Sequence, residues 1–193
     1  PTILRECGMY QGNPEVERQT RQGFPFDIEQ LDAVVISHTH LDHCGLLPRL
    51  VREGYRGPIY MTPATHDLLE VMLRDAAYLE EKDTEWENRQ RVRAGKQLIE
   101  PLYTEMDVDK TLGLREVLAY GEKQPVTTDI ILTYHDAGHI LGSAIVELTV
   151  TENRTTRRPL TPPFHGQWLS MSPRVSLAPG CAPKTSVPVG RLR

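Results

Sequence analysis

The hydrophobic positions of the chain alternate between short β-branched runs and longer stretches with helical spacing as far as Glu152. The run at residues 33–36, Ala-Val-Val-Ile, is typical of a strand that is covered on both faces. Other short apolar runs predict strands at residues 2–7, 59–62, 124–126, 130–134 and 143–150. Helices are predicted at residues 46–51, from Ala64 to about Gly95, and at residues 108–118. This order predicts an α/β fold, a layered sheet sandwich flanked by helices.

The longest predicted helix changes character along its length. One face of its first half carries the apolar side chains Leu68, Leu69, Met72, Leu73, Ala76 and Leu79. From Glu80 to Arg93 most positions are charged. We therefore expect the second half to be a solvated helix whose charges contribute mainly to solubility.

The composition excludes several classes of protein. At 193 residues the chain is long enough for one domain with a sizeable core. The net charge of -4 and the pI of about 6.0 exclude an overall basic field, so a nucleic acid would have to be held by a local patch or by metal ions. No run approaches the roughly 18 apolar residues of a membrane span. We therefore expect no membrane association. Because the three cysteines are an odd number with no paired spacing, we also expect a cytoplasmic protein in a reducing compartment.

Residues with metal-ligating side chains follow directly after the central predicted strand. Residues 37–45 read S-H-T-H-L-D-H-C-G, with three histidines and one aspartate close together. His38 and His40 are two residues apart, so on an extended backbone their imidazoles point the same way and can bind one ion. Asp42 and His43 follow at a turn and offer an oxygen and a nitrogen that could serve a second ion. This density of ligands predicts a metal site at the end of a buried strand.

The H-x-H-x-D-H pattern resembles the metal motif of the metallo-β-lactamase superfamily of metal-dependent hydrolases. Residues 136–144, D-A-G-H-I-L-G-S-A, are similar to the third metal motif of its RNA-processing β-CASP branch, which includes the cleavage and polyadenylation nuclease subunit and bacterial RNases. Residues 7–12, C-G-M-Y-Q-G, are similar to the segment that follows an early strand in the same proteins. The resemblance implies a metallo-β-lactamase-like αββα sandwich. We expect this chain to be a fragment of it, incomplete at both ends.

Carried over residue by residue, the resemblance implies that His38, His40 and His139 bind one zinc ion and leave a fourth position open for water. Asp42 and His43 would begin a second metal site, and they are also the candidate catalytic residues. The imidazole-rich ligands favour zinc, up to two ions in the complete family site, although manganese suits the more oxygen-rich second site.

The implied reaction is the hydrolysis of RNA phosphodiester bonds by metal-activated hydroxide. The family supplies a bridging carboxylate and a distal histidine further downstream, and neither has a match here, so we expect this chain to be weakly active or inactive. The alternatives are a small-molecule thioester hydrolase of the glyoxalase II kind and a non-catalytic metal-binding remnant. RNA is the expected partner of the complete protein, and a homodimer is a further expectation.

Two residues near these motifs are interpreted separately. Glu6 stands where the resembled family has an aspartate, and we interpret it as a tolerated departure because it should not bind metal directly. His135 lies four residues before His139; it either orients a metal ligand or is a polar residue at a strand end.

The composition changes after Glu152. Residues 153–193 contain seven Lys or Arg, no Asp or Glu, and seven of the 15 prolines. Because no hydrophobic period remains there, we expect residues 153–193 to be disordered or poorly packed, and residues 1–152 to form a partial metallo-β-lactamase domain. The tail is either a basic Pro-rich interaction arm or the translation of a shifted reading frame. We favour the second because the composition changes abruptly in mid-strand, where the resembled family would continue into its next metal motif.

Overall fold

The computed structural model describes residues 1–10, 20–152, 155–157, 160–161 and 176–178. Its strands are β1 (Thr2–Arg5), β2 (Ala33–Val35), β3 (Ile59–Met61), β4 (Arg115–Val117), β5 (Lys123–Thr127), β6 (Ile130–Asp136), β7 (Ala144–Glu152), β8 (Thr155–Arg157), β9 (Leu160–Thr161) and β10 (Ser176–Ala178). Its helices are the 3-10 turn η1 (Ile28–Gln30) and the α-helices α2 (Leu41–Cys44), α3 (Leu47–Arg52), α4 (Pro63–Arg93) and α5 (Glu105–Leu112).

The first sheet is parallel, with the strand order β10-β1-β2-β3-β4. The side chains of its central strand β2 alternate between two cores. Val34 belongs to the core that contains the helical leucines, whereas Ala33 and Val35 belong to the core shared with the second sheet. All three side chains are fully buried, which explains why the strand is a continuous apolar run in the sequence.

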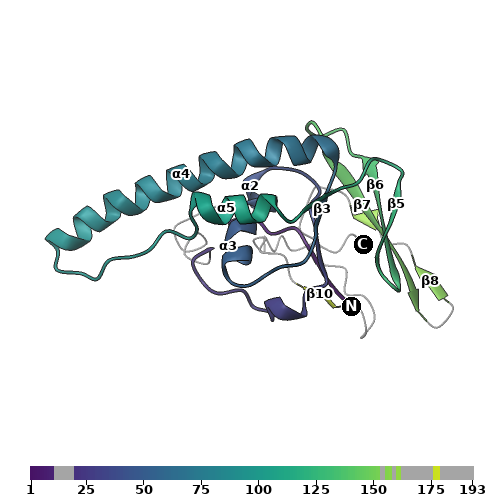
Figure 1. Cartoon of the computed structure of the whole chain (residues 1–193), viewed down its shortest axis with the longest axis horizontal. Helices are drawn as coiled ribbons and strands as arrows, with labels where there is room; N and C mark the ends of the chain where they lie inside the picture. The colour runs from purple at the N-terminus through teal and green to yellow at the C-terminus, as the bar shows by residue number, and fades with distance from the viewer. Residues whose placement is uncertain (11–19, 153–154, 158–159, 162–175, 179–193) are drawn as a thin grey trace, which may run out of the picture.

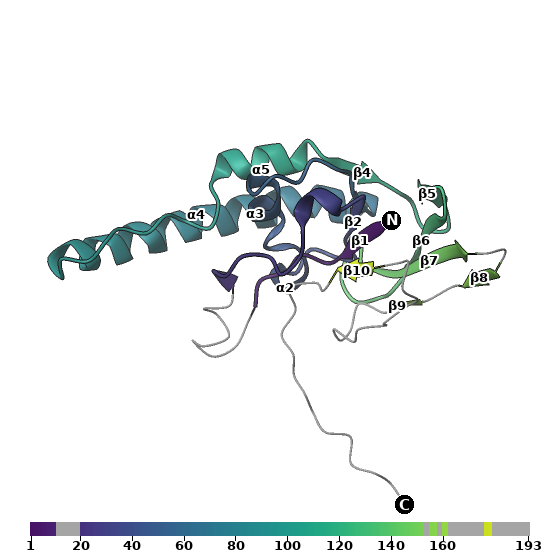
Figure 2. The same cartoon turned by 90° about the horizontal axis from the view of Figure 1, so that it is seen from below.

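The second sheet is antiparallel, with the order β5-β6-β7-β8 and β9 paired to β7. Leu132 and Tyr134 of β6 and Val146 of β7 pack against the first sheet. The Tyr134 hydroxyl donates to the Tyr60 carbonyl at 2.8 Å, so one polar contact also joins the sheets. The helices lie on the other side of the first sheet (Figures 1 and 2), so the described residues form three layers: helices, sheet and sheet.

Helix α4 begins at a capped end and extends beyond the sheets. Thr62 Oγ1 accepts a hydrogen bond from the Thr65 N–H at 3.3 Å, and a proline occupies the first helical position. In both views the second half of α4 projects away from the body of the molecule (Figures 1 and 2). There the Asn88 side chain exchanges two hydrogen bonds with the backbone of Ile99, which holds the returning loop against the helix. Across the described residues no helix combines the length and apolarity needed to cross a bilayer.

The predicted α/β class is confirmed, with two corrections to the predicted elements. Residues 108–118 are not one helix: α5 ends at Leu112, and Arg115–Val117 pair with β3 and extend the first sheet. Leu79, predicted on the buried face of the long helix, is 51% exposed. The buried stripe of α4 passes through Ala77 and Thr84, and Leu79 lies on the opposite side of the helix.

Part of the segment predicted to be disordered forms strands. β8 and β9 pair with β7, and β10 pairs with β1. The other residues of 153–193 lie outside the described residues, so for them the prediction stays a prediction.

Candidate metal centre

The histidine-rich segment lies at the carboxyl edge of the parallel sheet, where the two sheets meet. After β2, the Ile36 N–H donates to the Tyr60 carbonyl at 3.0 Å, and the Ala144 N–H of β7 donates to the Ser37 carbonyl at 2.9 Å. The chain then turns into α2, with His40 at its N-terminal cap. The loop is therefore fixed from both sheets, and a buried strand delivers its last residues to this edge, as expected for layered α/β folds.

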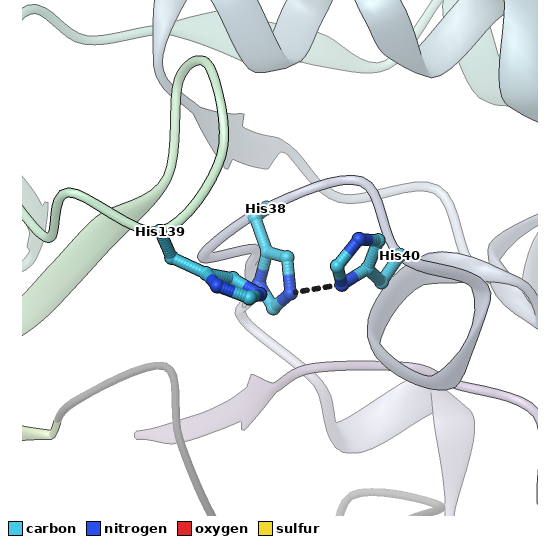
Figure 3. Close-up of side chains that lie close together, drawn as sticks. All are labelled: His38, His40 and His139. Carbon is cyan, nitrogen blue, oxygen red and sulfur yellow. Dashed lines mark hydrogen bonds between the residues drawn. The ribbon is translucent and has the colours of Figure 1, made fainter.

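Three imidazoles converge at this edge. His38, His40 and His139 each present a ring nitrogen, and these atoms lie within 4.8 Å of one another. His38 Nε2 is 3.1 Å from His40 Nδ1, and the His139 ring meets both other rings edge-on at centroid distances of 5.1 Å (Figure 3). His38 is buried and His139 is exposed, so solvent reaches the cluster on the side of His139.

The electrostatics of His38 suit it to bind a cation. Burial, reinforced by the nearby imidazole of His43, lowers the pKa of His38 to about 4. Its Nδ1 lies 2.8 Å from Ser37 Oγ, which leaves Nε2 directed toward His40. An imidazole that is neutral at pH 7 keeps a lone pair for a metal ion. The ring is thus held in both the charge state and the orientation that metal binding needs.

His139 is positioned by a tight loop between β6 and β7. Ser143 Oγ accepts hydrogen bonds from the backbone N–H groups of His139 and of the next residue, at 3.0 and 3.1 Å. Gly142 has a φ of +81°, a conformation that favours glycine. Its carbonyl accepts from the hydroxyls of Thr62 and Thr65 at 2.6 and 3.0 Å. A Cβ at this glycine would lie 2.5 Å from the Thr65 nitrogen, so the loop rests directly on the first turn of α4.

Asp42 and His43 adjoin the cluster at His38. The ring centroids of His43 and His38 are 4.1 Å apart, and His43 Nε2 lies 3.5 Å from Asp42 Oδ2. Nδ1 of His43 lies 3.3 Å from Glu6 Oε2. Burial opposes the charged form of His43, but the contact with Glu6 and the negative charges of Glu6 and Asp42 outweigh it, so the pKa of His43 is raised. These side chains offer oxygen and nitrogen ligands beside the first three.

Glu6, the residue directly after β1, supports the histidine-rich segment. Its buried carboxylate accepts a hydrogen bond from the Ser37 N–H at 3.2 Å, besides its contact with His43. Its φ of 65° is uncommon for a residue other than glycine. In this geometry Glu6 supports the loop that follows β2 and contacts His43, a role that the sequence did not suggest.

Residues 7–9, Cys-Gly-Met, run beside the histidine-rich segment. The Cys7 N–H donates to the His43 carbonyl at 2.7 Å, and the Cys7 carbonyl accepts from the Leu46 N–H at 2.8 Å. Gly8 lies against the turn, where a Cβ would overlap the backbone carbonyl of Asp42. The glycine is therefore required by close approach of two backbones.

The structure brings all five predicted site residues to one place, three in one cluster and two beside it. His135 is held elsewhere: its Nε2 lies 2.8 Å from Glu147 Oε2 on the neighbouring strand β7. This cross-strand contact favours the interpretation of His135 as a polar strand residue.

The sequence analysis did not identify two supporting hydroxyls, those of Ser37 and Ser143. The signal available for Ser37 was its place directly before a ligand histidine, and for Ser143 its place after the G-H-I-L-G stretch. Neither signal is specific, because serine is common in loops and only the folded geometry shows what its hydroxyl contacts.

Comparison with known proteins places the chain in a family. Residues 8–106 match the model of the β-lactamase superfamily domain. The chain is 40% identical over 144 residues to Ribonuclease TTHA0252 of Thermus thermophilus, covering 75% of this chain and 28% of that protein. It is 41% identical over 153 residues to transcription termination factor FttA of Methanocaldococcus jannaschii, covering 78% of this chain and 22% of that protein. The chain thus spans about a quarter of the length of the curated relatives it matches.

Among solved structures, the subclass B3 metallo-β-lactamase BJP-1 of Bradyrhizobium japonicum aligns with 82% of this chain and 50% of its own, at 19% identity and a TM-score of 0.46. The family match and the ribonuclease relative confirm the resemblance to the RNA-processing branch that the metal motifs predicted. The chain belongs to the β-lactamase superfamily.

Proposed function

We propose that the chain carries the metal-binding part of a metal-dependent hydrolase that cleaves RNA phosphodiester bonds. The observation that carries this proposal is the convergence of His38, His40 and His139, whose ring nitrogens lie within 4.8 Å of one another. The relative named as a ribonuclease supports RNA as the substrate class of the complete protein.

The residues present fit zinc. Three imidazole nitrogens form the ligand set of many catalytic zinc sites, and the solvent side of the cluster leaves a fourth position accessible. When bound, zinc supplies Lewis acidity and a nucleophilic water at neutral pH. The protein's contribution is positional: Ser37 orients the His38 ring, and the contact of Gly142 with Thr65 fixes the loop that carries His139.

We propose Asp42 and His43 as the first ligands of a second metal ion and as catalytic residues, because their side chains adjoin His38. Two ligands hold an ion weakly, and the carboxylate that would bridge two ions has no match in this sequence. We therefore expect one tightly bound zinc ion per chain and little or no RNA cleavage by the chain on its own.

Zinc binding tests the metal site. The chain is stripped with a chelator and reloaded, and zinc is quantified by mass spectrometry and calorimetry. His40→Ala should lose zinc, whereas His66→Ala should retain it, because the His66 side chain contacts Asp67 on α4 rather than the cluster. Outer partners of ligands are worth about 10- to 100-fold in metal affinity, so losing the ligand itself should cost more. Equal zinc affinity in the two variants would contradict the site.

Activity assays separate the reactions. Fluorescent single-stranded RNA and a thioester are offered to the reloaded chain and to His40→Ala. Two zinc ions per chain together with RNA cleavage that His40→Ala abolishes would overturn the expected weak activity. Thioester hydrolysis without RNA cleavage would favour the glyoxalase II alternative, which the ribonuclease relative does not favour. Zinc binding without either activity would favour the third alternative, a non-catalytic metal-binding remnant.

Three further proposals concern the chain as a whole. We propose that residues 1–152 are one partial domain and that residues 153–193 are a tail joined to it through β8, β9 and β10, which limited proteolysis would test by cleaving within the tail first. We propose a cytoplasmic location, supported by the odd number of cysteines. We also propose the homodimer that the sequence led us to expect, formed through α4 and not through the metal centre.

A further inference from the structure

The outward face of α4 exposes aromatic side chains that no other element of the described chain covers; within the helix, the Lys82 ammonium lies 5.8 Å from the centroid of the Tyr78 ring. Tyr78 and Trp86 are 53% and 60% exposed, although large aromatic rings usually bury much of their area. Val71 on the same face is 67% exposed. The opposite face of the helix is occupied by the core and by the loop that contacts Asn88. The outward face therefore has a composition suited to contact but no partner within the described chain.

The exposed positions on this face follow a coiled-coil spacing. Moving along the helix they are Val71, Asp75, Tyr78, Lys82, Trp86, Arg89 and Arg93, all exposed. The steps between them are four, three, four, four, three and four residues. At 3.6 residues per turn these steps keep every position within about 40° of the direction of Lys82, over about 33 Å of helix. We call these positions the seam; the extra step of four at its middle is a stutter, a known variation of the heptad repeat.

The seam is symmetric about Lys82. When a second copy of the helix is placed antiparallel about a two-fold axis at Lys82, each seam position meets the position equally far on the other side of it. The facing pairs are Asp75 with Arg89, Tyr78 with Trp86, Val71 with Arg93, and Lys82 with its own copy. The first pair is opposite in charge and occurs twice, and the second joins aromatic rings.

Away from the axis, the facing charges are complementary. Neither Asp75 nor Arg89 makes an ion pair with any described residue, so both are available to a partner. The two copies of Lys82 are the one like-charged pair. Each ammonium already lies 3.1 Å from Glu85 of its own helix, and a lysine on a long stem can move its charge to solvent.

We propose that α4 pairs antiparallel with α4 of a second copy of this chain, around a two-fold axis at Lys82. This interface is independent of the metal centre and of the proposed reaction. RNA fits the seam less well, because Asp75 and the neighbouring Glu85 lie among its cations and the chain carries a net charge of -4. A self-complementary pattern of this kind is what an isologous contact requires.

Charge exchange tests the register. Asp75→Arg and Arg89→Asp each place like charges opposite each other twice, so each should weaken self-association by about tenfold or more. An equimolar mixture of the two variants restores both opposite pairs and should associate again. Asp83→Arg is the matched control, because Asp83 is exposed on the same helix but outside the seam. Sedimentation of the full chain should give twice its 21.9 kDa mass for the wild type, the control and the mixture.

Cross-linking at the axis gives a second measurement. Lys82→Cys, made with Cys181→Ser, should form a covalent dimer under mild oxidation because only a residue on the axis meets its own copy. Glu87→Cys, on the other side of α4, should not. A wild type that stays monomeric at high concentration, or two single variants that do not associate when mixed, would overturn the proposal. RNA binding that Trp86→Ala abolishes in a monomeric chain would assign the face to RNA and would also overturn it.

Discussion

Replacing Gly142 by alanine tests how the His139 loop is held. The glycine has a φ of +81°, and an alanine in this conformation costs about 1–2 kcal/mol. Its Cβ would lie 2.5 Å from the Thr65 nitrogen and 2.9 Å from Thr65 Oγ1, so the loop must move off α4. That movement breaks the two hydrogen bonds from Thr62 and Thr65 to the Gly142 carbonyl, worth about 1 kcal/mol each. We expect Gly142→Ala to destabilise the chain by about 3–4 kcal/mol.

Gly138→Ala is the matched control. Gly138 is in the same loop and also has a positive φ, 64°, but nothing lies within 4 Å of its would-be Cβ. It should therefore cost only about 1–2 kcal/mol, from the backbone conformation. Calorimetry on the metal-free chain should show Gly142→Ala melting about 4–8 °C below Gly138→Ala, which is the shift expected for about 2 kcal/mol. Equal melting temperatures would refute the inference that the contact with α4 positions the loop.

Three further predictions follow from the site. Gly8→Ala should lower zinc affinity and stability together, because its Cβ overlaps the Asp42 carbonyl, whereas Gly23→Ala should be nearly neutral since nothing lies within 4 Å of that position; denaturant melts and zinc titration would show both. Ser37→Ala should weaken zinc binding by about 10- to 100-fold, measured by competition with a chelator, while an unchanged affinity would mean that the hydroxyl does not orient His38. The pKa of His38 is about 4 in the folded chain, against 6.5 for an unperturbed imidazole, so its contribution to the stability of the metal-free chain is complete above pH 6.5 and is lost as the pH falls toward 4. The difference in free energy of unfolding between wild type and His38→Asn should shrink over that range, by on the order of 3 kcal/mol, and a constant difference would contradict the burial argument.

Much of the fold was predictable because its signals are local. The apolar run at residues 33–36 predicted a doubly covered strand, and β2 is that strand. β4 was missed because Arg115 is only half-buried and Glu116 and Val117 are exposed, so the three residues carry no hydrophobic pattern and join the sheet by pairing with β3. Leu79 was misplaced because the buried stripe on α4 continues through Thr84, a polar residue that gives no hydrophobic signal. Local patterns show which residues are apolar, and they do not show which side of a helix a distant element will cover.

The candidate ligands were identifiable from residue type and spacing, whereas the supports around them were not. His38 and His40 are close in the chain, but His139 joins them through a resemblance and not through spacing. The contact of Gly142 with Thr65 joins residues 77 positions apart, and the contact of the Ser37 N–H with Glu6 joins residues 31 apart. Such contacts depend on how two sheets and a helix pack, and no local pattern encodes them.

The proposed ligands come from both sheets, so metal binding there would be coupled to folding. His38 and His40 follow β2 of the first sheet, His139 precedes β7 of the second, and the Ala144 N–H donates to the Ser37 carbonyl between them. An ion that binds only when the sheets are docked stabilises the docked state, by about 4 kcal/mol at a thousand times its dissociation constant. A variant that displaces the His139 loop loses intrinsic stability and also part of this gain. The difference between Gly142→Ala and Gly138→Ala should therefore be larger in saturating zinc than without it. If zinc left that difference unchanged, His139 would not belong to the metal site.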